Sequence, residues 1–511
     1  MDRAIIIGSR GSDLALWQAN YVKNELDKLG QQSEIKIIQT QGDRVQDLSF
    51  DKLEGKGFFT KEIEQQLLSE EIDLAVHSHK DLETTPPKGL IVASVPERAD
   101  PSELILISKK SYDPKMKFGL KANAIIGTSS ARRKNQLRAF RPDLELKDLR
   151  GNVPTRINKL AQDQYDAIML AKAGVSRLNI DLSEFQVTEL LPTEFIPAPA
   201  QGALALQIRE DDQKLAVVLT QLTDQETLAT VQIERKVLNL LEGGCQLPLG
   251  VYVERDGEEF RLWASLAENW QDMPVRIHRT GDSESLALTA VEVLKKKAPP
   301  SRIYVSRNLP EEHFVQRYCK SRGSTIRARS QIEIEFISTD FPLTDWVFFS
   351  SANCVRAYFR NTGVNNSTRY AAIGGATAEV LNEFGPCNFV GNGPPNEVAK
   401  QFKKIVGKGT VCFPGSNKSL RTIEKFIPKN QVSGVTAYVT HEAAVPVEES
   451  DYYLFTSPSN VSAFLQVNEL PEGATVIAIG PSTKTRLTQL GIPARQSSLT
   501  TIFSMIEEVS I

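Results

Sequence analysis

A short polar run interrupts an apolar stretch near residue 80. The strand-like segment Ile72–His77 leads directly into Ser78-His79-Lys80-Asp81. A carboxylate in this position can transfer a proton and stabilise a developing cation, whereas a helix cap or an ion pair with Lys80 is the structural alternative. His77 and His79 share one face of a strand, but no third ligand is evident, so we expect no metal site.

A second run joins hydroxyl groups to cations. Thr128-Ser129-Ser130 follows the strand-like segment Ala124–Gly127 and precedes Arg132 and Arg133. A Ser/Thr turn at the start of a helix presents free backbone N–H groups to an anion, and a guanidinium group binds a carboxylate through two parallel hydrogen bonds. The run therefore favours an anion site, with solvated surface arginines as the alternative.

The third candidate is Cys245. It follows Gly243 and Gly244, which permit a tight turn and a close approach of the backbone. A buried, unreactive thiol is the alternative interpretation. The chain has five cysteines and no CxxC pair, and an odd, scattered set favours reduced thiols and a cytoplasmic location.

These runs lie at the junctions of alternating strands and helices. The first part predicts strands and helices at Ala4–Gly8, Asp13–Leu29, Glu34–Gln39, Thr60–Ser69 and Ile72–His77. A second unit of the same style begins near Pro101, with strands at Ala124–Gly127 and Asp166–Ala171 and a helix within Thr128–Ala139. This alternation indicates βαβ units around a sheet. The Pro-rich segment 196–202 predicts a crossing between lobes.

The last third of the chain contains an internal repeat. An offset of 106 residues takes Asp345 to Asp451 and aligns the residues that follow without gaps. The same offset takes Ala372-Ile373-Gly374 to Ala478-Ile479-Gly480, and Thr377 to Thr483. Each copy predicts a strand, a Ser-rich turn and a helix, then a strand, a Gly turn and a helix. Two similar α/β lobes are therefore expected, with a ligand cleft between them.

Length and composition exclude several classes of protein. A chain of 511 residues is too long for one hydrophobic core. A formal net charge of −3 gives no reason to expect binding to nucleic acid or a membrane, and no apolar stretch approaches the roughly 20 residues of a membrane span. The charged, Pro-containing segment Lys295–Pro300 is the clearest linker.

Five runs in the first part of the chain resemble porphobilinogen deaminase, also called hydroxymethylbilane synthase. They begin at Ser9, Val76, Gly127, Leu149 and Leu241 and occur in the family's order. The family joins four porphobilinogen units head to tail, with loss of ammonia. The resemblance covers residues 1 to about 297.

This resemblance implies roles for individual residues. Asp81 matches the catalytic acid, and Cys245 matches the cysteine that carries a covalent dipyrromethane cofactor. Residues that match the cofactor-binding set are Lys80, Ser129, Arg132 and Arg133. Those that match the substrate-binding set are Arg10, Ser12, Thr128, Ser130, Arg150, Arg156 and Arg177. One departure is the pair Pro199-Ala200, where a Val-Gly type pair is common; we expect it to change the stiffness of the hinge.

Residues from about 301 to 511 resemble uroporphyrinogen-III synthase. That family closes hydroxymethylbilane into a ring and inverts the last pyrrole. Tyr438 matches a tyrosine that assists departure of the hydroxyl group, although a strand residue packed between lobes is an equal alternative. The other residues that the resemblance places in the cleft are Ser351, Thr377, Ser457 and Thr483.

The sequence therefore predicts a multidomain α/β chain with two activities. The resemblances imply two lobes like those of periplasmic binding proteins and a small α+β third domain, followed by two flavodoxin-like lobes. Residues 1–297 divide into lobe 1 (about 1–97 plus 198–216), lobe 2 (about 101–193) and domain 3 (about 222–297). After a linker at 298–301, residues 302–511 divide into lobe 1 (about 302–334 plus 440–511) and lobe 2 (about 335–439).

Porphobilinogen and hydroxymethylbilane are the expected small-molecule partners, and we expect a monomer without nucleic-acid or membrane partners. Two rival hypotheses remain open. In the first, both halves are carboxylate-binding modules without activity. In the second, an active deaminase carries a degenerate regulatory module at its C-terminal end. A covalent cofactor on Cys245 would exclude the first rival, and an inactive C-terminal half would favour the second.

Overall fold

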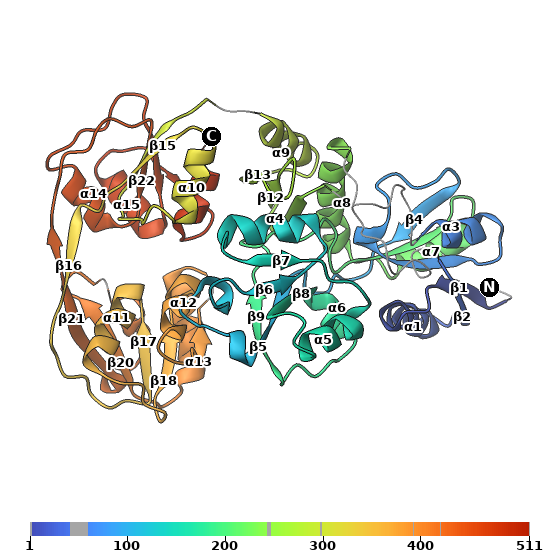
Figure 1. Cartoon of the computed structure of the whole chain (residues 1–511), viewed down its shortest axis with the longest axis horizontal. Helices are drawn as coiled ribbons and strands as arrows, with labels where there is room; N and C mark the ends of the chain where they lie inside the picture. Colours follow the sequence, from blue (N-terminus) through green and yellow to red (C-terminus); the bar gives the residue numbers. More distant parts are fainter. Residues whose placement is uncertain are drawn as a thin grey trace. The chain divides into compact units, whose positions relative to one another are not determined.

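Strands and helices alternate along most of the chain, which confirms the predicted α/β class. The computed structural model describes residues 3–40, 60–242, 247–296, 299–391, 393–419 and 421–509. The chain divides into two units, Met1–Lys297 (unit 1) and Ala298–Ile511 (unit 2), whose helices and strands are labelled in Figure 1.

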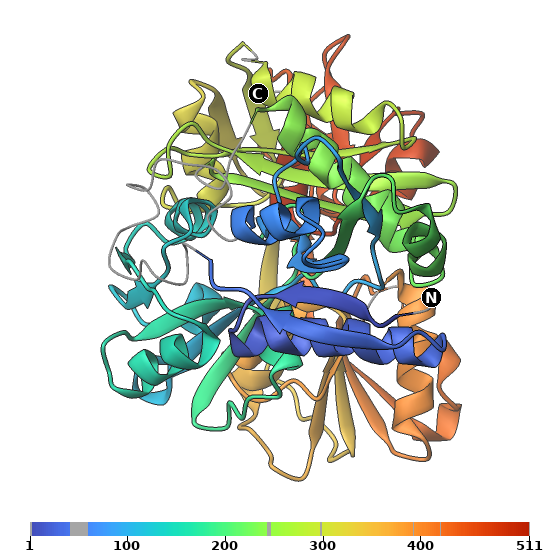
Figure 2. The same ribbon diagram turned by 90° about the vertical axis from the view of Figure 1, so that its right-hand side faces the viewer.

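Lobe A of unit 1 is a five-stranded sheet. Its order is β2 (Ser33–Ile37), β1 (Ile5–Ser9), β3 (Leu74–Ser78), β10 (Leu204–Arg209) and β4 (Leu90–Ser94). Only β10 runs against the other strands. The helix α1 (Asp13–Lys28) begins after Ser12, whose hydroxyl oxygen accepts the N–H of Ala15 at 3.4 Å. Figure 2 shows α1 beside β1 and β2, where its apolar face enters the core of this lobe.

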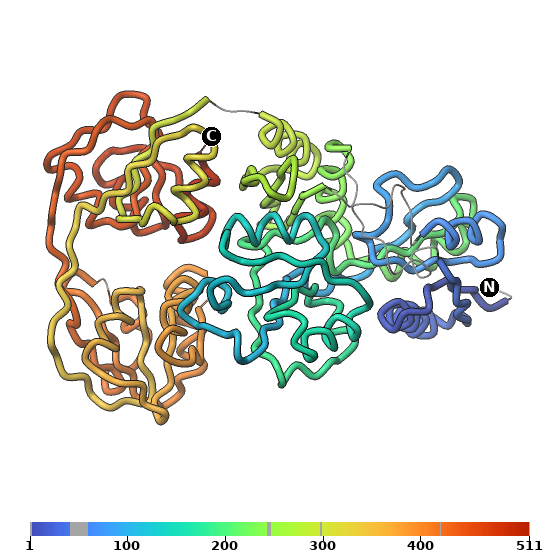
Figure 3. Tube along the Cα trace, viewed as in Figure 1, coloured from blue at the N-terminus to red at the C-terminus, as the bar shows by residue number. Residues whose placement is uncertain are grey.

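Lobe B repeats this arrangement. Its order is β7 (Glu145–Lys147), β6 (Ile125–Gly127), β8 (Ala167–Ala171), β5 (Glu103–Ser108) and β9 (Phe185–Leu190), and only β5 is reversed. The chain thus passes from lobe A to lobe B between β4 and β5 and returns between β9 and β10, a path that can be followed in Figure 3. We call these segments, 95–102 and 191–203, the two crossings.

The third domain of unit 1 packs two helices on an antiparallel sheet. The sheet contains β11 (Leu249–Asp256), β12 (Glu259–Leu266) and β13 (Val275–Gly281), and α8 (Gln225–Leu240) and α9 (Leu286–Lys295) bury their apolar faces against it.

A carboxylate of α8 joins this domain to both crossings. The side chain of Glu234 is fully buried and accepts two hydrogen bonds from the guanidinium of Arg98, at 2.8 and 3.0 Å. It also accepts the N–H groups of Ala200 at 2.6 Å and Val253 at 2.9 Å. Arg98 lies on the first crossing, Ala200 on the second and Val253 on β11. Glu234 therefore fixes all three segments relative to one another.

The second crossing has an unusual backbone at the Pro199-Ala200 pair. Ala200 has a φ of +60°, which costs a residue with a Cβ about 1–2 kcal/mol. Gly202 has a φ of +87°, and a Cβ there would lie 2.3 Å from the carbonyl oxygen of Ala99 on the first crossing. The two crossings thus touch at Gly202, and Ala200 is held in the left-handed region beside them.

Unit 2 contains two lobes, and the five parallel strands of each occupy equivalent positions in its sheet although the chain visits them in a different order. In lobe C the order is β15 (Thr325–Ala328), β14 (Arg302–Val305), β22 (Tyr452–Phe455), β23 (Thr475–Ala478) and β24 (Arg495–Gln496), all parallel. This is the flavodoxin order 2-1-3-4-5.

In lobe D the parallel strands are β21 (Val432–Glu442), β20 (Val411–Ser416), β17 (Trp346–Phe349), β18 (Arg369–Ala372) and β19 (Phe389–Val390). The antiparallel β16 (Ile332–Phe336) adds to the edge at β21.

The repeat predicted from the sequence is visible in the backbone of these lobes. The offset of 106 residues takes β17, β18 and β19 onto β22, β23 and β24. It also takes Ser351 onto Ser457, and both residues cap a helix with nearly the same dihedral angles. The first two strands of lobe C come from the start of unit 2, whereas their spatial counterparts in lobe D come from its middle. The lobes are therefore permuted copies of one arrangement.

The segments that join lobes C and D run side by side. β16 leaves lobe C as β21 returns to it, and the two strands pair through five residues. At their lobe C end, the backbone N–H of Gln331 donates to the side-chain oxygen of Asn460 at 2.8 Å, and the Gln331 side chain accepts the N–H of Val445 at 2.8 Å. These buried contacts fix the pair of strands to lobe C.

Candidate active sites

The polar run after β3 forms a short 3₁₀ turn, His79–Asp81, rather than the end of the strand that the sequence predicts. Arg235 of α8 holds this turn, because its guanidinium donates to the carbonyl oxygens of His79, Leu82 and Glu83 at 2.9, 3.1 and 2.5 Å. His79 is buried, whereas Asp81 is exposed. The turn thus presents Asp81 at the surface while its backbone stays fixed.

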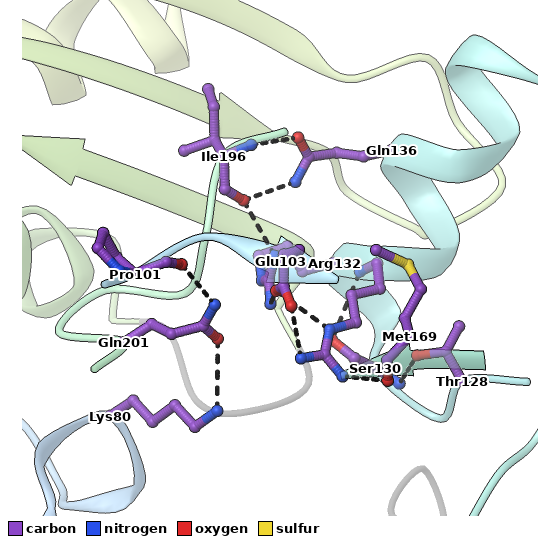
Figure 4. Close-up of polar contacts among 11 residues, drawn as sticks. Lys80, Pro101, Glu103, Thr128, Ser130, Arg132, Gln136, Met169, Ile196 and Gln201 are labelled. Atoms are coloured by element: carbon purple, nitrogen blue, oxygen red, sulfur yellow. Dashed lines mark hydrogen bonds and ion pairs between the residues drawn. The ribbon is translucent and has the colours of Figure 1, made fainter. Parts of the chain in front are cut away.

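Lys80 contacts the second crossing. Its Nζ lies 3.4 Å from Oε1 of Gln201, and Nε2 of Gln201 donates to the carbonyl oxygen of Pro101 at 2.8 Å. Figure 4 shows this chain of contacts. Burial lowers the pKa of Lys80, and the positive charges of Arg133 and Arg132 lower it further against the opposing effect of Asp81.

The predicted anion-binding run precedes and caps a helix, as its hydroxyl side chains indicate. The helix α4 spans Ala131–Phe140, and the hydroxyl oxygen of Ser130 caps it by accepting the N–H of Arg133 at 3.4 Å. Ser129 donates its hydroxyl to the carbonyl of Leu149 and accepts that residue's N–H. The side chain of Thr128 accepts the N–H of Ser130 at 3.3 Å. These hydroxyl groups therefore fix the backbone of the turn.

Arg132 and Arg133 both bind one buried carboxylate, which the sequence analysis missed. Glu103 Oε1 accepts from Arg132 at 2.6 Å and from Nε of Arg133 at 3.1 Å, and Oε2 accepts from Arg133 at 2.7 Å. Arg132 also donates to the carbonyl of Ile196 on the second crossing, at 3.0 Å. Burial alone would raise the pKa of Glu103, but the two guanidinium groups outweigh it and lower the pKa to about 2.

Two further predicted arginines join this cluster electrostatically. Burial and the positive charges of Arg133 and Arg150 lower the pKa of Arg156 to about 10, and the carboxylate of Asp81 opposes them. Arg156 remains charged at neutral pH. The structure therefore lets one carboxylate and five cations interact electrostatically. They are Asp81, Lys80, Arg132, Arg133, Arg150 and Arg156.

The remaining predicted residues of unit 1 lie near α1. Arg177 donates to the carbonyl oxygen of Gly202 at 2.6 Å, and its guanidinium lies 5.5 Å from the ring centre of Trp17. Ser12 caps α1, and Arg10 is half-buried just before it. Cys245 lies outside the described residues.

The imidazole ring of His77 makes a hydrogen bond with another buried side chain. Its Nε2 lies 3.1 Å from Oε1 of Gln207, and burial lowers its pKa to about 4. Within the described ranges, no group of three or more His, Cys, Asp or Glu side chains could hold a metal ion.

In unit 2 the predicted cleft residues lie at helix starts and on a joining strand. Ser351 and Ser457 cap α11 (Ala352–Asn361) and α14 (Pro458–Phe464). Thr377 and Thr483 lie in the first turns of α12 (Gly375–Asn382) and α15 (Pro481–Gln489), and both are buried.

Tyr438 is a buried strand residue whose hydroxyl reaches another of the predicted cleft residues. It is 8% exposed on β21 and packs into the core of lobe D, yet its hydroxyl lies 3.4 Å from that of Ser351. Burial, with a smaller effect from Cys354, raises the pKa of Tyr438 to about 12. The phenol therefore keeps its proton at neutral pH.

Two arginines of unit 2, Arg307 and Arg356, were not predicted from the sequence. Arg307 follows β14 and Arg356 lies on α11, so they come from different lobes. Burial lowers the pKa of Arg307, and the charge of Arg356 lowers it further. Their proximity depends on the fold, because nearly 50 residues separate them in the sequence.

The fold defines unit 1 as a two-lobed α/β protein, and the cation cluster beside the crossings is suited to carboxylates. The comparisons with known proteins agree. Residues 5–217 match the family model described as porphobilinogen deaminase, dipyromethane cofactor binding domain, and residues 228–296 match the model of its C-terminal domain. Residues 315–507 match the model for uroporphyrinogen-III synthase HemD.

Two relatives match most of their own length to this chain. Porphobilinogen deaminase of Oceanobacillus iheyensis is 46% identical over 269 residues, which are 52% of this chain and 85% of that protein. The deaminase of Geobacillus kaustophilus is 42% identical over 305 residues, 59% and 97% of the two chains. The chain belongs to the porphobilinogen deaminase family, and a uroporphyrinogen-III synthase domain follows.

Both resemblances stated from the motifs are thus confirmed. A solved uroporphyrinogen-III synthetase of Helicobacter pylori is 15% identical, covering 40% of this chain and 97% of its own, with a TM-score of 0.32.

We expect Asp81→Asn to reduce ammonia release from porphobilinogen by about a thousandfold or more, because an amide can neither donate the proton nor balance a cation. Folding should be unchanged, since Asp81 is exposed. Ammonia production by the purified full chain measures the effect. Glu83→Gln, two residues along the same loop, is the matched control and should keep its turnover. Near-normal release from the Asp81 variant would place the acid elsewhere.

We expect Tyr438→Phe to slow ring closure by about a hundredfold if its phenol acts as a proton donor. Slower capture should increase the share of the type I isomer of uroporphyrinogen. Tyr358→Phe, which removes a hydroxyl from another buried tyrosine of lobe D, should leave the isomer ratio unchanged. An unchanged ratio for both variants would make Tyr438 a packing residue. Chromatography of the oxidised products measures the ratio.

Proposed function

We propose that this chain is a bifunctional enzyme of tetrapyrrole synthesis. It condenses four porphobilinogen molecules into hydroxymethylbilane with release of ammonia, and then closes the product to uroporphyrinogen III with inversion of the last ring. The observation that carries this proposal is the succession of a complete deaminase and a synthase domain in one chain.

In the deaminase, Asp81 is the proposed acid. An exposed carboxylate on a fixed turn can protonate the leaving amine and then stabilise the cationic azafulvene that its departure leaves. The same carboxylate can take up the proton that is released after the carbon–carbon bond forms. The carboxylate of Asp81 opposes the lowering of the pKa of Arg156, which supports a position of Asp81 beside the proposed carboxylate-binding cations.

The cations of the cluster bind the carboxylates of the pyrroles. Every porphobilinogen brings an acetate and a propionate, so each addition introduces two negative charges. We propose that Arg10, Ser12, Thr128, Ser130, Arg150, Arg156 and Arg177 contact the substrate chain. Ser12 lies at the start of α1 in lobe A, whereas Arg150, Arg156 and Arg177 belong to lobe B.

The donor set also fits the dipyrromethane cofactor, which carries acetate and propionate groups of its own. Lys80, Ser129, Arg132 and Arg133 are the proposed contacts, and the contacts to Glu103, Ile196 and Met169 use only part of the N–H groups of the two arginines. When bound to Cys245, the cofactor supplies the primer for the first addition. The protein orients that primer by its carboxylates.

In the synthase, positioning is the main requirement, because hydroxymethylbilane loses its hydroxyl readily and closes unaided without inversion. We propose that Ser351, Thr377, Ser457 and Thr483 line the cleft between lobes C and D and that Tyr438 donates a proton to the departing hydroxyl. The contact between Tyr438 and Ser351 supports this arrangement.

We further propose that the predicted domain boundaries are the functional ones and that the chain acts as a cytoplasmic monomer without a nucleic-acid partner. The described cysteines Cys319, Cys354, Cys387 and Cys412 are free thiols, which suits a reducing compartment. Among the described residues, no helix has both the length and the apolar composition that a membrane crossing requires.

We expect Cys245→Ser to give a folded protein without the covalent cofactor. The mass of the denatured wild-type chain should exceed its sequence mass by two linked pyrroles, and the variant should lack this excess. Peptide mapping of the wild-type protein identifies the cysteine that carries the two pyrroles. A pyrrole adduct on another cysteine would contradict the assignment.

We expect the full chain, given only porphobilinogen, to produce mainly type III uroporphyrinogen. A shortened chain ending at Pro299 should release hydroxymethylbilane, which closes to type I. Adding residues 301–511 as a separate protein should restore type III, although less efficiently, because a covalent tether raises the local concentration of acceptor sites. Mostly type I product from the full chain would favour a degenerate C-terminal module.

A further inference from the structure

Glu103 lies at the point where lobe B begins after the first crossing. It is the first residue of β5, its side chain is fully buried, and its backbone pairs with Ala171 of β8 and Leu190 of β9. The backbone that carries this carboxylate is therefore fixed by the pairing of three strands. Its three contacts with Arg132 and Arg133, at 2.6 to 3.1 Å, are ion pairs closed off from water.

The contacts impose an orientation that the helix alone does not give. Arg132 and Arg133 are consecutive residues in the first turn of α4, so their side chains leave the helix in directions about 100° apart. Their like charges also repel each other. Both guanidinium groups nevertheless meet at Glu103, which turns them toward one another and leaves their remaining N–H groups in fixed directions.

The carboxylate also sets the charge of this pair. Two guanidinium groups and one carboxylate leave a single net positive charge. Lys80 belongs to the same field, since Glu103 and both arginines affect its pKa. A loss of the Glu103 charge would therefore add a full positive charge at the place where the pyrrole carboxylates are proposed to bind.

We propose that Glu103 is a positioning residue that holds Arg132 and Arg133 as one singly charged receptor for pyrrole carboxylates and thereby limits how tightly the growing chain is held. This inference rests on the proposed deaminase activity. Elongation requires both retention and movement, because each addition brings two carboxylates and the finished tetrapyrrole must still leave. Tighter binding of every intermediate would slow release without helping the chemical step.

The test is Glu103→Gln in the full chain carrying its cofactor, with porphobilinogen as the probe. The amide keeps the side chain's shape but removes its charge. We expect kcat to fall at least about tenfold, since one unit charge a few ångströms from a carboxylate changes its affinity by that order or more. The KM for porphobilinogen should stay unchanged or fall. Native mass spectrometry should show enzyme with bound intermediates persisting after substrate is exhausted.

Glu234→Gln is the matched control. Glu234 is also fully buried and binds a guanidinium group through both oxygens, but it contacts Arg98 rather than α4. Both variants should lower the temperature of unfolding, because each leaves a buried cation without its partner. With rates expressed per folded, cofactor-bearing molecule, the Glu234 variant should show the wild-type distribution of intermediates.

A double variant keeps the inference testable if Glu103→Gln folds poorly. Glu103→Gln with Arg132→Gln restores a single net positive charge, and it should release product at least severalfold faster than Glu103→Gln alone. If Glu103→Gln gives the wild-type distribution of intermediates per folded molecule, or if the double variant releases product no faster, Glu103 has only a structural role. Absence of turnover in the wild-type chain would instead contradict the deaminase activity itself.

Discussion

Two buried carboxylates hold unit 1 together where the chain crosses between its lobes. Glu234 accepts hydrogen bonds from Arg98 and Ala200, one on each crossing. Glu103 follows the first crossing and binds Arg132, which in turn donates to Ile196 on the second. A buried charge is tolerated only when it is paired and hydrogen-bonded. These contacts therefore specify one arrangement of the crossings, and those of Glu103 also orient two arginines of the proposed site.

The crossings also explain why the site lies where it does. Each lobe has the same strand order, with one reversed strand that arrives from the other lobe. Lys80 follows the strand of lobe A that pairs with the reversed β10, and Glu103 opens the reversed β5 of lobe B. The polar residues at the ends of these two strands therefore lie next to the crossings. Ala200, in its left-handed conformation beside Gly202, lies within this region, so the strain of the hinge and the binding groups share one segment.

Short sequence patterns were enough to predict the helix starts in both units and the internal repeat of unit 2. Ser12, Ser130, Ser351 and Ser457 each precede a helix and cap it, and the repeat is readable because its two copies keep one spacing. Glu103 was not predictable in this way. It opens an ordinary apolar strand, and its partners are about 30 residues away on a helix. The electrostatic effect of Arg356 on Arg307 likewise depends on two lobes, so neither residue carries a local signal for the other.

The two units present different chemistry to the same kind of molecule. The residues proposed to bind substrate in unit 1 are mainly cations, which suit a chain that must stay bound through successive additions. The predicted residues of unit 2 are mainly hydroxyl groups at the starts of helices and a phenol whose pKa of about 12 keeps it protonated. Hydroxymethylbilane reacts unaided, so the synthase must change only the preference between two ring closures. Neutral donors can orient the substrate for that purpose without the long retention that a cation cluster imposes, and orientation alone is enough to select one closure.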